Sequence, residues 1–408
     1  MTSRKVSTST YAWIIVGLLW VVAFLNYFDR ILITSMRDPI VKAFTINDAE
    51  FGLLTSVFLW SYGILSPLGG YFADKYGRKP VIVFSVAVWS VVTLWTGFAQ
   101  SFHEMVAARL CMGISEACYI PAALALIADY HRGSTRSLAT GIHMSGLYAG
   151  LALGGLGGYI SDIWGWRFGF QVFGFFGVAY AFLLVLFLKK PPYSNADQQV
   201  IDDSVVAPVR LSKAFKLFSN ISFNILLFYF CAYGIVNWLI YAWLPTFLKS
   251  HFHLGLGKAG ISATGYVQIG SFAGVLLGGF LADRWFHFNK RGRVYIIIIG
   301  FTIGAPFLFL LSFTYSFALA IASMIIYGIA RGFNDANLMP VLCQVVDEKY
   351  IATGYGFLNF LSTIVGGIMV FAGGVLRDSN VSLSLIYGGS AAFLLLAAWS
   401  LYFIKIKK

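Results

Sequence analysis

Charged side chains interrupt several of the long apolar stretches of this chain. Three acidic and three basic residues lie well inside such stretches: Asp29, Arg30, Arg109, Glu116, Arg331 and Asp335. A charge at the centre of a bilayer costs roughly 2.5–3.5 kcal/mol, so such residues face a bundle interior and pair or act there. A carboxyl group in that setting can take up and release a proton. A planar guanidinium can hold a carboxylate through two hydrogen bonds.

The composition indicates that these stretches lie in a membrane. Of 408 residues, 59% are hydrophobic and 11% are charged, whereas a soluble domain has about 25% charged residues. A spanning helix needs about 20 apolar residues. Twelve runs meet that need: 12–34, 51–72, 80–99, 104–127, 137–160, 167–188, 220–247, 259–282, 294–312, 315–338, 351–374 and 382–404. The sequence predicts an all-α polytopic membrane protein. The first run has no small-residue cleavage site after it, which argues against a signal peptide.

The basic residues predict the orientation. Most of the 29 lysines and arginines fall in segments that lie inside the cell if the N-terminus is cytoplasmic, among them DKYGRK, HRGSTR and NKRGR. This asymmetry follows the positive-inside rule and predicts that both termini are cytoplasmic. The excess of positive charge, +12, therefore reflects topology, and no nucleic-acid partner is expected. The short loops favour a bacterial inner membrane.

The chain divides into two similar halves. We expect one six-helix bundle over 1–188, a cytoplasmic linker over 189–218 and a second six-helix bundle over 219–408. GGYFADKYGRK after the second run is echoed by GGFLADRW after the eighth, and LATGIHMSG in the fifth by IATGYGFLN in the eleventh. Such a duplication predicts pseudo-symmetric bundles with a substrate site between them, near the middle of the membrane.

These motifs resemble the signatures of the major facilitator superfamily, and the resemblance covers the whole chain. It rests on the loop Gly-x-x-Ala-Asp-x-x-Gly-Arg-Lys at 70–79, on RLCMGISEACYIP in the fourth run and on the glycine-rich SGLYAGLALGGLGG in the fifth. NYFDR in the first run, together with Glu116, is similar to the anion:cation symporters of sugar acids and to sialin-like carriers. It also resembles the spinster-like lipid transporters, and the motifs separate these groups poorly. The resemblance implies the major facilitator fold.

The spacing of the charges suggests how protons could be carried. Arg109 and Glu116 are seven residues apart and share one helix face. We expect Asp29 to meet Arg109 across the helix interface, which leaves Arg30 free to point at the cavity and to bind a substrate carboxylate. Asp29 and Glu116, tuned by Arg109, are the predicted proton carriers. The alternative is a permanent ion-pair network that never titrates.

Other charges are candidates for gating. Asp74 and Arg78, in the loop after the second run, could latch the cytoplasmic side, and Asp283 repeats the acidic position in the second half. The alternative is a topogenic basic loop. Arg331 and Asp335, four residues apart, can pair with each other at the cytoplasmic mouth or contribute to the substrate site.

Neutral polar residues could complete a substrate site together with Arg30. The candidates are Tyr27, Tyr62, His143, Asn237, Tyr241, Gln268 and Asn359. The resemblance to sugar-acid carriers implies hydroxyl and carboxylate contacts for Tyr27, Tyr62 and Asn359. His143 departs from the glutamine expected near this position in those carriers.

The sequence therefore predicts a proton-coupled symporter of a small organic anion, a sugar acid such as a hexonate, hexuronate or sialic acid. The alternative is a spinster-like transporter of a lysolipid or another amphiphile. A membrane enzyme or receptor is less compatible with the chain, which shows no catalytic cluster, soluble domain or Walker A motif. We expect a monomer with no cofactor and no metal; its partners are the organic anion, protons and the lipid bilayer.

Overall fold

The computed structural model describes residues 10–131, 135–189, 215–347 and 350–406, and every regular element within these ranges is a helix. The N-terminal elements are α1 (Thr10–Leu32), η1 (Ile33–Met36), α2 (Arg37–Phe44), α3 (Asp48–Tyr76), α4 (Arg78–Phe98), α5 (Phe102–Glu116), α6 (Tyr119–Tyr130), α7 (Arg136–Leu153), η2 (Gly154–Leu156), α8 (Gly157–Trp164) and α9 (Trp166–Phe187). The C-terminal elements are η3 (Phe215–Ser219), α12 (Ile221–His251), α13 (Leu256–Phe286), α14 (Gly292–Phe313), α15 (Phe317–Val345), α16 (Ile351–Asp378), α17 (Leu383–Ser400) and η5 (Leu401–Phe403).

The helices confirm the predicted all-α polytopic membrane fold. Within the described residues, 11 helical stretches are long and apolar enough to cross a membrane. The predicted run at 137–160 is built from α7, η2 and α8, because the helix tightens to a 3₁₀ turn at Gly154–Leu156. The run at 104–127 is likewise divided, between α5 and α6.

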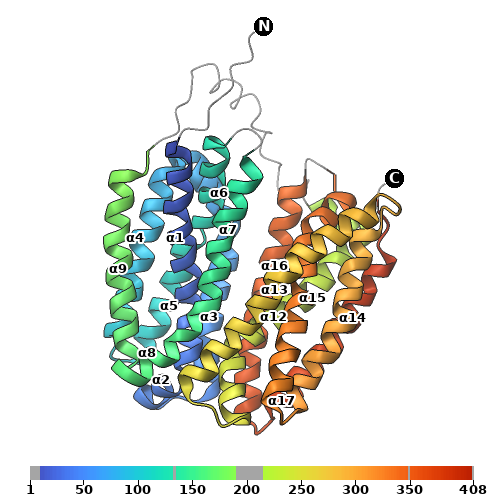
Figure 1. Ribbon diagram of the computed structural model, residues 1–408. Coiled ribbons are helices and arrows are strands. Elements are labelled where there is room, and N and C mark those ends of the chain that lie inside the picture. The colour runs from blue at the N-terminus through green and yellow to red at the C-terminus, as the bar shows by residue number, and fades with distance from the viewer. Residues whose placement is uncertain (1–9, 132–134, 190–214, 348–349, 407–408) are drawn as a thin grey trace.

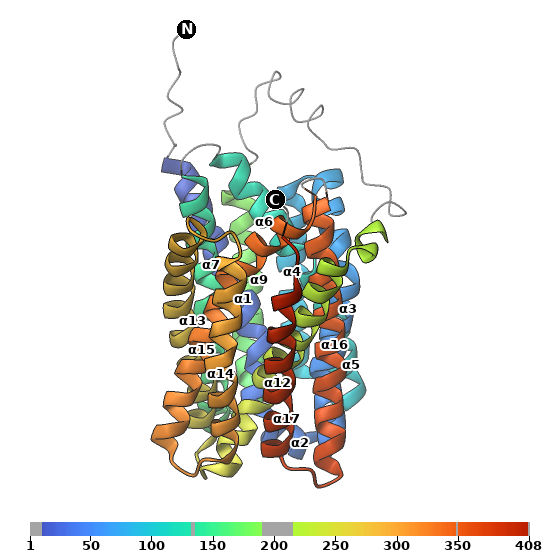
Figure 2. The same ribbon diagram turned by 90° about the vertical axis from the view of Figure 1, so that its right-hand side faces the viewer.

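The helices form two groups that stand side by side, with α1–α9 in one group and α12–α17 in the other (Figure 1). We call these the N-terminal and C-terminal bundles. α1 begins and α17 ends at the same end of the molecule, which we call the terminal end (Figure 2). α2 lies at the opposite, distal end. Most of the predicted linker over 189–218 lies outside the described residues.

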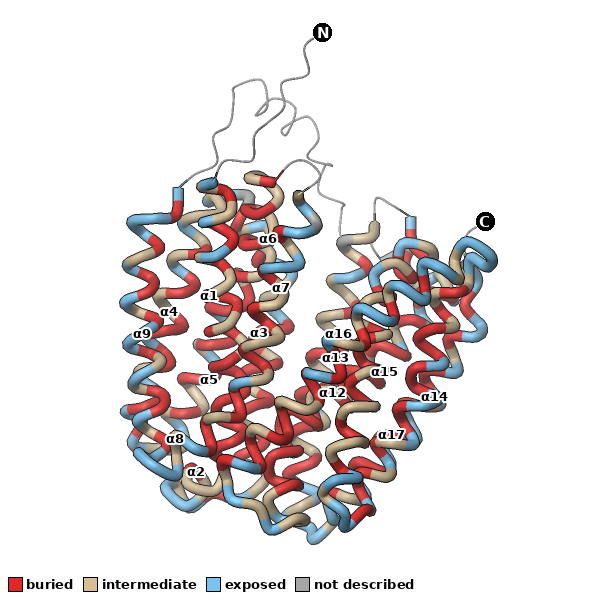
Figure 3. The backbone as a smooth tube through the Cα atoms, in the orientation of Figure 1, coloured by how far each residue is buried: buried red, intermediate tan, exposed pale blue. Residues whose placement is uncertain are grey.

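The two bundles touch along α3 and α16, which run beside each other. Ser56 Oγ on α3 donates a hydrogen bond of 2.7 Å to the Gly367 carbonyl on α16, and Trp60 Nε1 donates one of 3.2 Å to the Ile364 carbonyl. On the other side, α13 packs against α7, η2 and α8. Buried residues line the facing helices toward the distal end (Figure 3). The cavity described below is lined by residues of both bundles.

Local signals fix where α3 begins. Asn47 and Glu50 form a reciprocal capping box: the Asn47 side chain accepts from the Glu50 backbone N–H at 2.8 Å, and the Glu50 carboxylate accepts from the Asn47 N–H at 2.9 Å. This satisfies backbone donors that have no partner within the helix. The start of α3 is thereby held at the distal end, next to the end of α16.

Close packing between α13 and α15 sets the position of the charged segment of α15. A Cβ atom at Gly332 would lie 2.3 Å from the Ser271 carbonyl oxygen and 2.5 Å from the Val275 nitrogen, both backbone atoms of α13. Backbone cannot move aside as a flexible side chain can, so even a methyl group would push the helices apart. We predict that Gly332→Ala lowers the free energy of unfolding by about 1–3 kcal/mol, the usual cost of overpacking.

Thermal unfolding in detergent, followed by tryptophan fluorescence, measures this loss. Gly279→Ala on α13 is the matched control, since a Cβ atom there meets no atom within 4 Å. That control should keep or raise the melting temperature, because alanine favours a helix over glycine. Equal melting temperatures for the two variants would contradict the packing argument.

Candidate functional site

The centre of the N-terminal bundle holds a buried ion pair between α1 and α5. Arg30 Nε donates to Glu116 Oε2 at 2.7 Å, and both side chains are almost fully buried. The Arg30 guanidinium lies 4.5 Å from the ring centroid of Tyr27 and 4.4 Å from that of Tyr62. Such contacts hold a cation by its charge and by its planar face.

This pairing corrects the expectation that Arg30 is free to face the cavity. A desolvated guanidinium and a desolvated carboxylate stabilise each other strongly, and leaving either alone is costly. The sequence places Arg30 on α1 and Glu116 on α5 without showing which neighbouring helix each will meet. The rotation of α1 brings Arg30, rather than Asp29, to Glu116.

Asp29 and Arg109 do not form the expected ion pair. Asp29 Oδ2 accepts a hydrogen bond of 3.2 Å from Thr93 Oγ1 on α4. Arg109 Nε instead donates to the Leu54 carbonyl on α3 at 3.2 Å, and its guanidinium lies 4.7 Å from the Phe58 ring centroid. Both side chains are buried. Asp29 Oδ1 and Glu116 Oε1 have no hydrogen-bond partner among the described residues, so both acids keep an oxygen that can accept a proton.

A cavity of about 430 Å³ lies between the two bundles. Its lining residues are Tyr27, Leu124, Met144, Leu147, Tyr148 and Leu151 from the N-terminal bundle, and Phe230, Tyr233, Gly234, Asn237, Trp238, Tyr241, Arg331, Asp335, Leu338, Met339, Tyr355, Asn359, Ser362 and Thr363 from the C-terminal bundle. Most of the hydrogen-bonding groups come from α12, α15 and α16. The N-terminal wall is mainly apolar.

Four of the proposed substrate residues line this cavity: Tyr27, Asn237, Tyr241 and Asn359. Gln268 supports the lining from behind, since its Nε2 donates to the Tyr241 hydroxyl at 2.9 Å. Tyr62 stacks on Arg30 and is not a lining residue. His143 is fully buried away from the lining, with its ring centroid 6.0 Å from that of Tyr119. His143 packs within the bundle in this conformation.

Arg331 and Asp335, proposed for gating, both line the cavity. Arg331 Nε lies 3.7 Å from Asp335 Oδ2 and donates to the Tyr233 hydroxyl at 3.3 Å. Tyr233 in turn donates to Asp335 Oδ1 at 2.9 Å. Arg331 Nη1 has no hydrogen-bond partner among the described residues. Both side chains therefore belong to the cavity wall, and whether the pair serves substrate binding or gating stays a prediction.

Several lining residues were not predicted, among them Tyr148, Tyr233, Trp238 and Tyr355. Ser362 and Thr363 could have been found from the sequence, because they lie three and four residues after Asn359 and therefore share its helix face. The tyrosines carried no comparable signal, since tyrosine is abundant in the chain, with 22 copies. Among the described residues, no cluster of three or more His, Cys, Asp or Glu side chains could hold a metal ion.

Charged residues that the sequence analysis missed join the bundles at the distal end. Lys249 on α12 pairs with Asp38 on α2, and Arg377 Nε on α16 lies 3.4 Å from Asp48 Oδ2 on α3. The Asp378 carboxylate accepts from the backbone N–H groups of Asp48 at 3.0 Å and of Ala49 at 2.9 Å. A carboxylate at a helix N-terminus is favoured by the free donors and the helix dipole. These contacts join the two bundles at the distal end.

Two ion pairs among the described residues at the terminal end each join helices of a single bundle. Arg78 Nε pairs with Asp129 Oδ2 at 2.8 Å, which ties the start of α4 to the end of α6. Arg293 Nη2 pairs with Asp283 Oδ1 at 3.0 Å in the C-terminal bundle. The side chain of Asp74 lies outside the described part of the structure. The two described pairs brace corners of their own bundles, and their gating role stays a prediction.

Comparisons with known proteins agree with this architecture. The family model described as Major Facilitator Superfamily matches residues 19–370. The chain belongs to the major facilitator superfamily and is a membrane transporter of that fold. It is 28% identical over 400 residues to protein spinster homolog 1 of Xenopus laevis, covering 94% of this chain and 75% of that protein. It is 24% identical to the probable galactarate/D-glucarate transporter GarP of Escherichia coli K12, covering 97% and 95%.

Solved structures show the same fold. A bacterial homologue of the human lysosomal transporter Spinster, in an inward-facing and occupied conformation, superposes with a TM-score of 0.79 at 23% identity, over 97% of each chain. A D-xylose–proton symporter superposes with a TM-score of 0.78 at 14% identity, over 97% of this chain and 98% of the other. The predicted resemblance to the superfamily and its spinster and sugar-acid branches is confirmed.

The Arg30–Glu116 pair yields a stability prediction. Glu116→Leu leaves Arg30 buried without its partner and should cost about 3–5 kcal/mol of unfolding free energy. The double variant Arg30→Met/Glu116→Leu should recover part of that loss, because it removes both charges. Chemical or thermal unfolding of the wild type, the two single variants and the double variant gives the coupling energy. Strictly additive losses would contradict a direct pair.

The distal contacts yield a conformational prediction. The reporter is Asn237→Cys in a cysteine-free background, and its rate of reaction with a polar thiol reagent measures access to the cavity from the distal side. Asp378→Ala should raise this rate, because two interbundle hydrogen bonds are lost. Glu104→Ala is the control: its carboxylate accepts from Gln100 in the same bundle, at the same end of the molecule. Equal rates in both variants would show that the distal contacts do not keep the cavity closed.

Proposed function

We propose that this protein is a proton-coupled symporter of a small, hydroxyl-bearing organic anion of the sugar-acid class, such as a hexonate, hexuronate or sialic acid. The observation that carries the proposal is Arg331, which lines the cavity and whose buried Nη1 has no hydrogen-bond partner among the described residues. Arg331 takes the carboxylate-binding role first assigned to Arg30. A guanidinium is suited to binding a planar carboxylate.

The remaining lining suits a polyol chain. Asn237, Asn359, Ser362 and Thr363 offer amide and hydroxyl groups within the same cavity, and the Trp238 indole offers a flat apolar face. A volume of about 430 Å³ is within the ordinary range for small-ligand sites. The proposal therefore pairs one charge contact for the carboxylate with several neutral contacts for hydroxyl groups.

Asp29 and Glu116 carry the protons in this proposal. Protonation of Glu116 removes the charge that holds Arg30 and loosens the α1–α5 contact. Tyr27 transmits that change, because its ring stacks on the Arg30 guanidinium and also lines the cavity. Arg109, buried near both acids, keeps the site from accumulating negative charge. Tyr27 is thus common to the proton site and the substrate site, whereas Asp29 and Glu116 lie outside the cavity lining.

The orientation follows from the basic segments. With both termini in the cytoplasm of a bacterial cell, the distal end faces outward, and the contacts of Asp38, Asp48 and Asp378 close the outer side. Rocking of the two bundles exchanges this conformation for one open to the outside, which is the usual alternating-access movement of such folds. One chain contains a whole cavity, so we propose a monomer in the inner membrane.

A second candidate is a spinster-like carrier of a lysolipid or similar amphiphile. It is favoured by the apolar N-terminal wall of the cavity, formed by Leu124, Met144, Leu147 and Leu151. An amphiphile would lay its chain on that wall and its headgroup at Arg331 and Asp335. The two candidates therefore differ in whether the apolar wall is occupied by substrate.

Uptake into proteoliposomes under an inward pH gradient tests the proposal. The panel is glucarate, galactarate, glucuronate, gluconate and sialic acid, with a fluorescent lysophosphatidylcholine for the second candidate. We predict gradient-driven uptake of at least one acid, lost in Glu116→Gln and Asp29→Asn. Arg331→Gln should raise KM by about 10- to 100-fold, as expected for a lost charge-assisted contact of about 1.5–3 kcal/mol.

The control is Lys405→Gln, which removes an exposed positive charge outside the cavity and should leave uptake unchanged. Movement of the lysolipid without any acid would establish the second candidate. Uptake that survives neutralisation of both Asp29 and Glu116 would mean that these acids are structural and that the coupling mechanism is wrong.

A further inference from the structure

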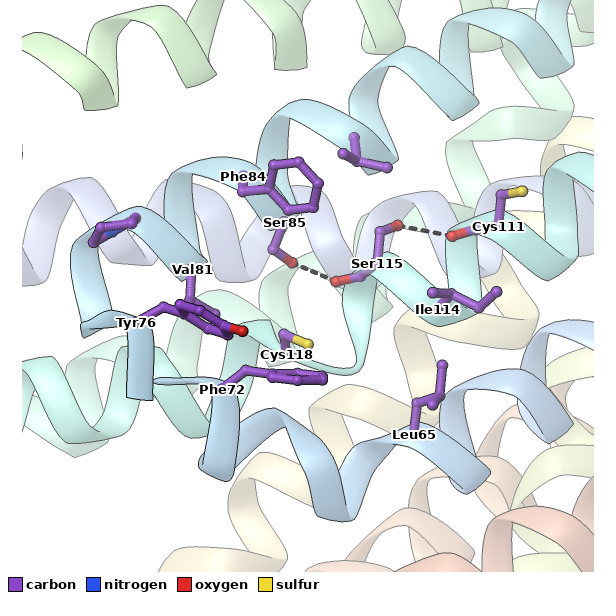
Figure 4. A pocket seen from close by; sticks show the side chains of 12 residues that line it. Leu65, Phe72, Tyr76, Val81, Phe84, Ser85, Cys111, Ile114, Ser115 and Cys118 are labelled. Atoms are coloured by element: carbon purple, nitrogen blue, oxygen red, sulfur yellow. Dashed lines mark hydrogen bonds between the residues drawn. The ribbon is translucent and has the colours of Figure 1, made fainter. Parts of the chain in front are cut away.

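A second, larger hollow lies on the outer face of the N-terminal bundle, away from the transport cavity. It has a volume of about 630 Å³ and lies between α3, α4 and the junction of α5 with α6 (Figure 4). We call it the lateral groove. Its lining residues are Leu65, Phe72, Tyr76, Pro80, Val81, Phe84, Ser85, Val88, Cys111, Ile114, Ser115 and Cys118.

The polar groups of the groove floor already have partners. Ser85 Oγ donates to the Ser115 carbonyl at 2.5 Å, and Ser115 Oγ donates to the Cys111 carbonyl at 3.0 Å, as the dashed lines in Figure 4 show. Both serine hydroxyls of the lining thus donate to backbone carbonyls. The groove therefore suits a hydrocarbon chain.

The groove lies where it can contact the acyl chains of the bilayer. Its walls belong to three stretches that can span the membrane, Asp48–Ala73, Arg78–Phe98 and Phe102–Tyr130. Its rim is exposed at Phe84 (71%) and Ile114 (45%). Water cannot fill an apolar hollow within the hydrocarbon layer, whereas the neighbouring acyl chains can.

The hollow lies beside the short interruption between α5 and α6. α5 ends at Glu116 and α6 begins at Tyr119, and Cys118 at the junction lines the groove. α3 approaches this break closely: a Cβ atom at Gly69 would lie 2.5 Å from the Ala117 carbonyl oxygen. The residue just before the break, Glu116, is the one that pairs with Arg30 inside the bundle.

The groove reaches positive charge at the terminal end. It extends to Tyr76 and Pro80, on either side of the turn at Gly77. The Lys75 ammonium lies 5.3 Å from the Tyr76 ring centroid and pairs with no acidic group of the described residues. Lys79 Nζ donates to the Val185 carbonyl at 2.9 Å. An anionic headgroup at the membrane surface is attracted to such lysines.

We propose that the lateral groove is a binding site for an anionic phospholipid, with one acyl chain between α3, α4 and the α5–α6 junction and the headgroup at Lys75. This site is separate from the transport cavity and does not depend on the identity of the transported substrate. The bound chain packs against the junction that carries Glu116. Occupancy of the groove therefore restrains the helix break beside the buried ion pair.

Native mass spectrometry of the detergent-solubilised protein tests the proposal with dioleoyl phosphatidylglycerol and dioleoyl phosphatidylcholine as probes. The wild type should retain one phosphatidylglycerol in preference to phosphatidylcholine. Lys75→Gln should weaken that retention by about five-fold, the loss for one basic residue near an anionic surface. Ile114→Trp should also weaken it, because the larger side chain fills the groove.

The matched controls are Lys405→Gln, which removes an exposed lysine from the C-terminal bundle, and Leu396→Trp, which enlarges an exposed residue of α17. Both should retain phosphatidylglycerol as the wild type does. Equal retention of the two lipids by the wild type, or undiminished retention in both groove variants, would overturn the proposal.

The native cysteines give a measurement on the unaltered chain. Cys111 and Cys118 line the groove, whereas Cys343 is exposed elsewhere on α15. Phosphatidylglycerol should slow alkylation of Cys118 by a membrane-permeant maleimide and leave Cys343 unaffected. Equal protection of the two cysteines, or none, would contradict a chain bound in the groove.

Discussion

The rest of the site depends on how buried charge is neutralised in an interior without bulk water. Arg30 meets Glu116 at 2.7 Å between α1 and α5, and two aromatic rings enclose the guanidinium. Loss of the charge on one partner of such a pair leaves the other charge buried without compensation, which is strongly destabilising. Gain or loss of a proton at Glu116 is such a change. A local chemical event can therefore alter how two helices pack.

The buried ion pair and most of the polar cavity lining lie in different bundles. The N-terminal bundle holds the acids that can carry protons, and the C-terminal bundle supplies Arg331 and most of the hydrogen-bonding groups of the cavity. Tyr27 belongs to both environments. At the distal end, Asp378 and Asp48 tie the bundles together, so the two halves can move only by exchanging these contacts for others. In the proposed function, proton uptake and anion binding act on one movement from opposite sides of the cavity.

Much of this architecture could be predicted from the sequence, because a membrane restricts the structures that a chain can adopt. Apolar runs of about 20 residues become helices, and the intramembrane charges must lie inside. Asn237, Tyr241 and Asn359 were expected in the cavity and are found there. The division of two predicted spans into α5–α6 and α7–η2–α8 was not foreseen, since hydropathy does not register a break in helix geometry.

The features that could not be predicted depend on the rotation of each helix about its axis and on contacts between residues far apart in the sequence. A rotation of about 100° separates Asp29 from Arg30 on one helix, so packing alone decides which of them meets Glu116. The distal network joins Asp48 to Asp378, which are 330 residues apart, and no local pattern indicates such a contact. The spacing of Arg331 and Asp335 allowed either a pair at the cytoplasmic mouth or a contribution to the substrate site, and it could not show that both residues line the cavity.

The most direct measurement of the central claim is the proton balance when the substrate binds. In lightly buffered detergent solution, a pH-sensitive dye reports whether the purified protein takes up protons as a transported acid is added. Since binding equilibria are reciprocal, coupling requires proton uptake by the wild type and its loss in Glu116→Gln, with anion binding retained. Anion binding with no proton uptake at any pH would contradict the account and leave the Arg30–Glu116 pair a structural feature.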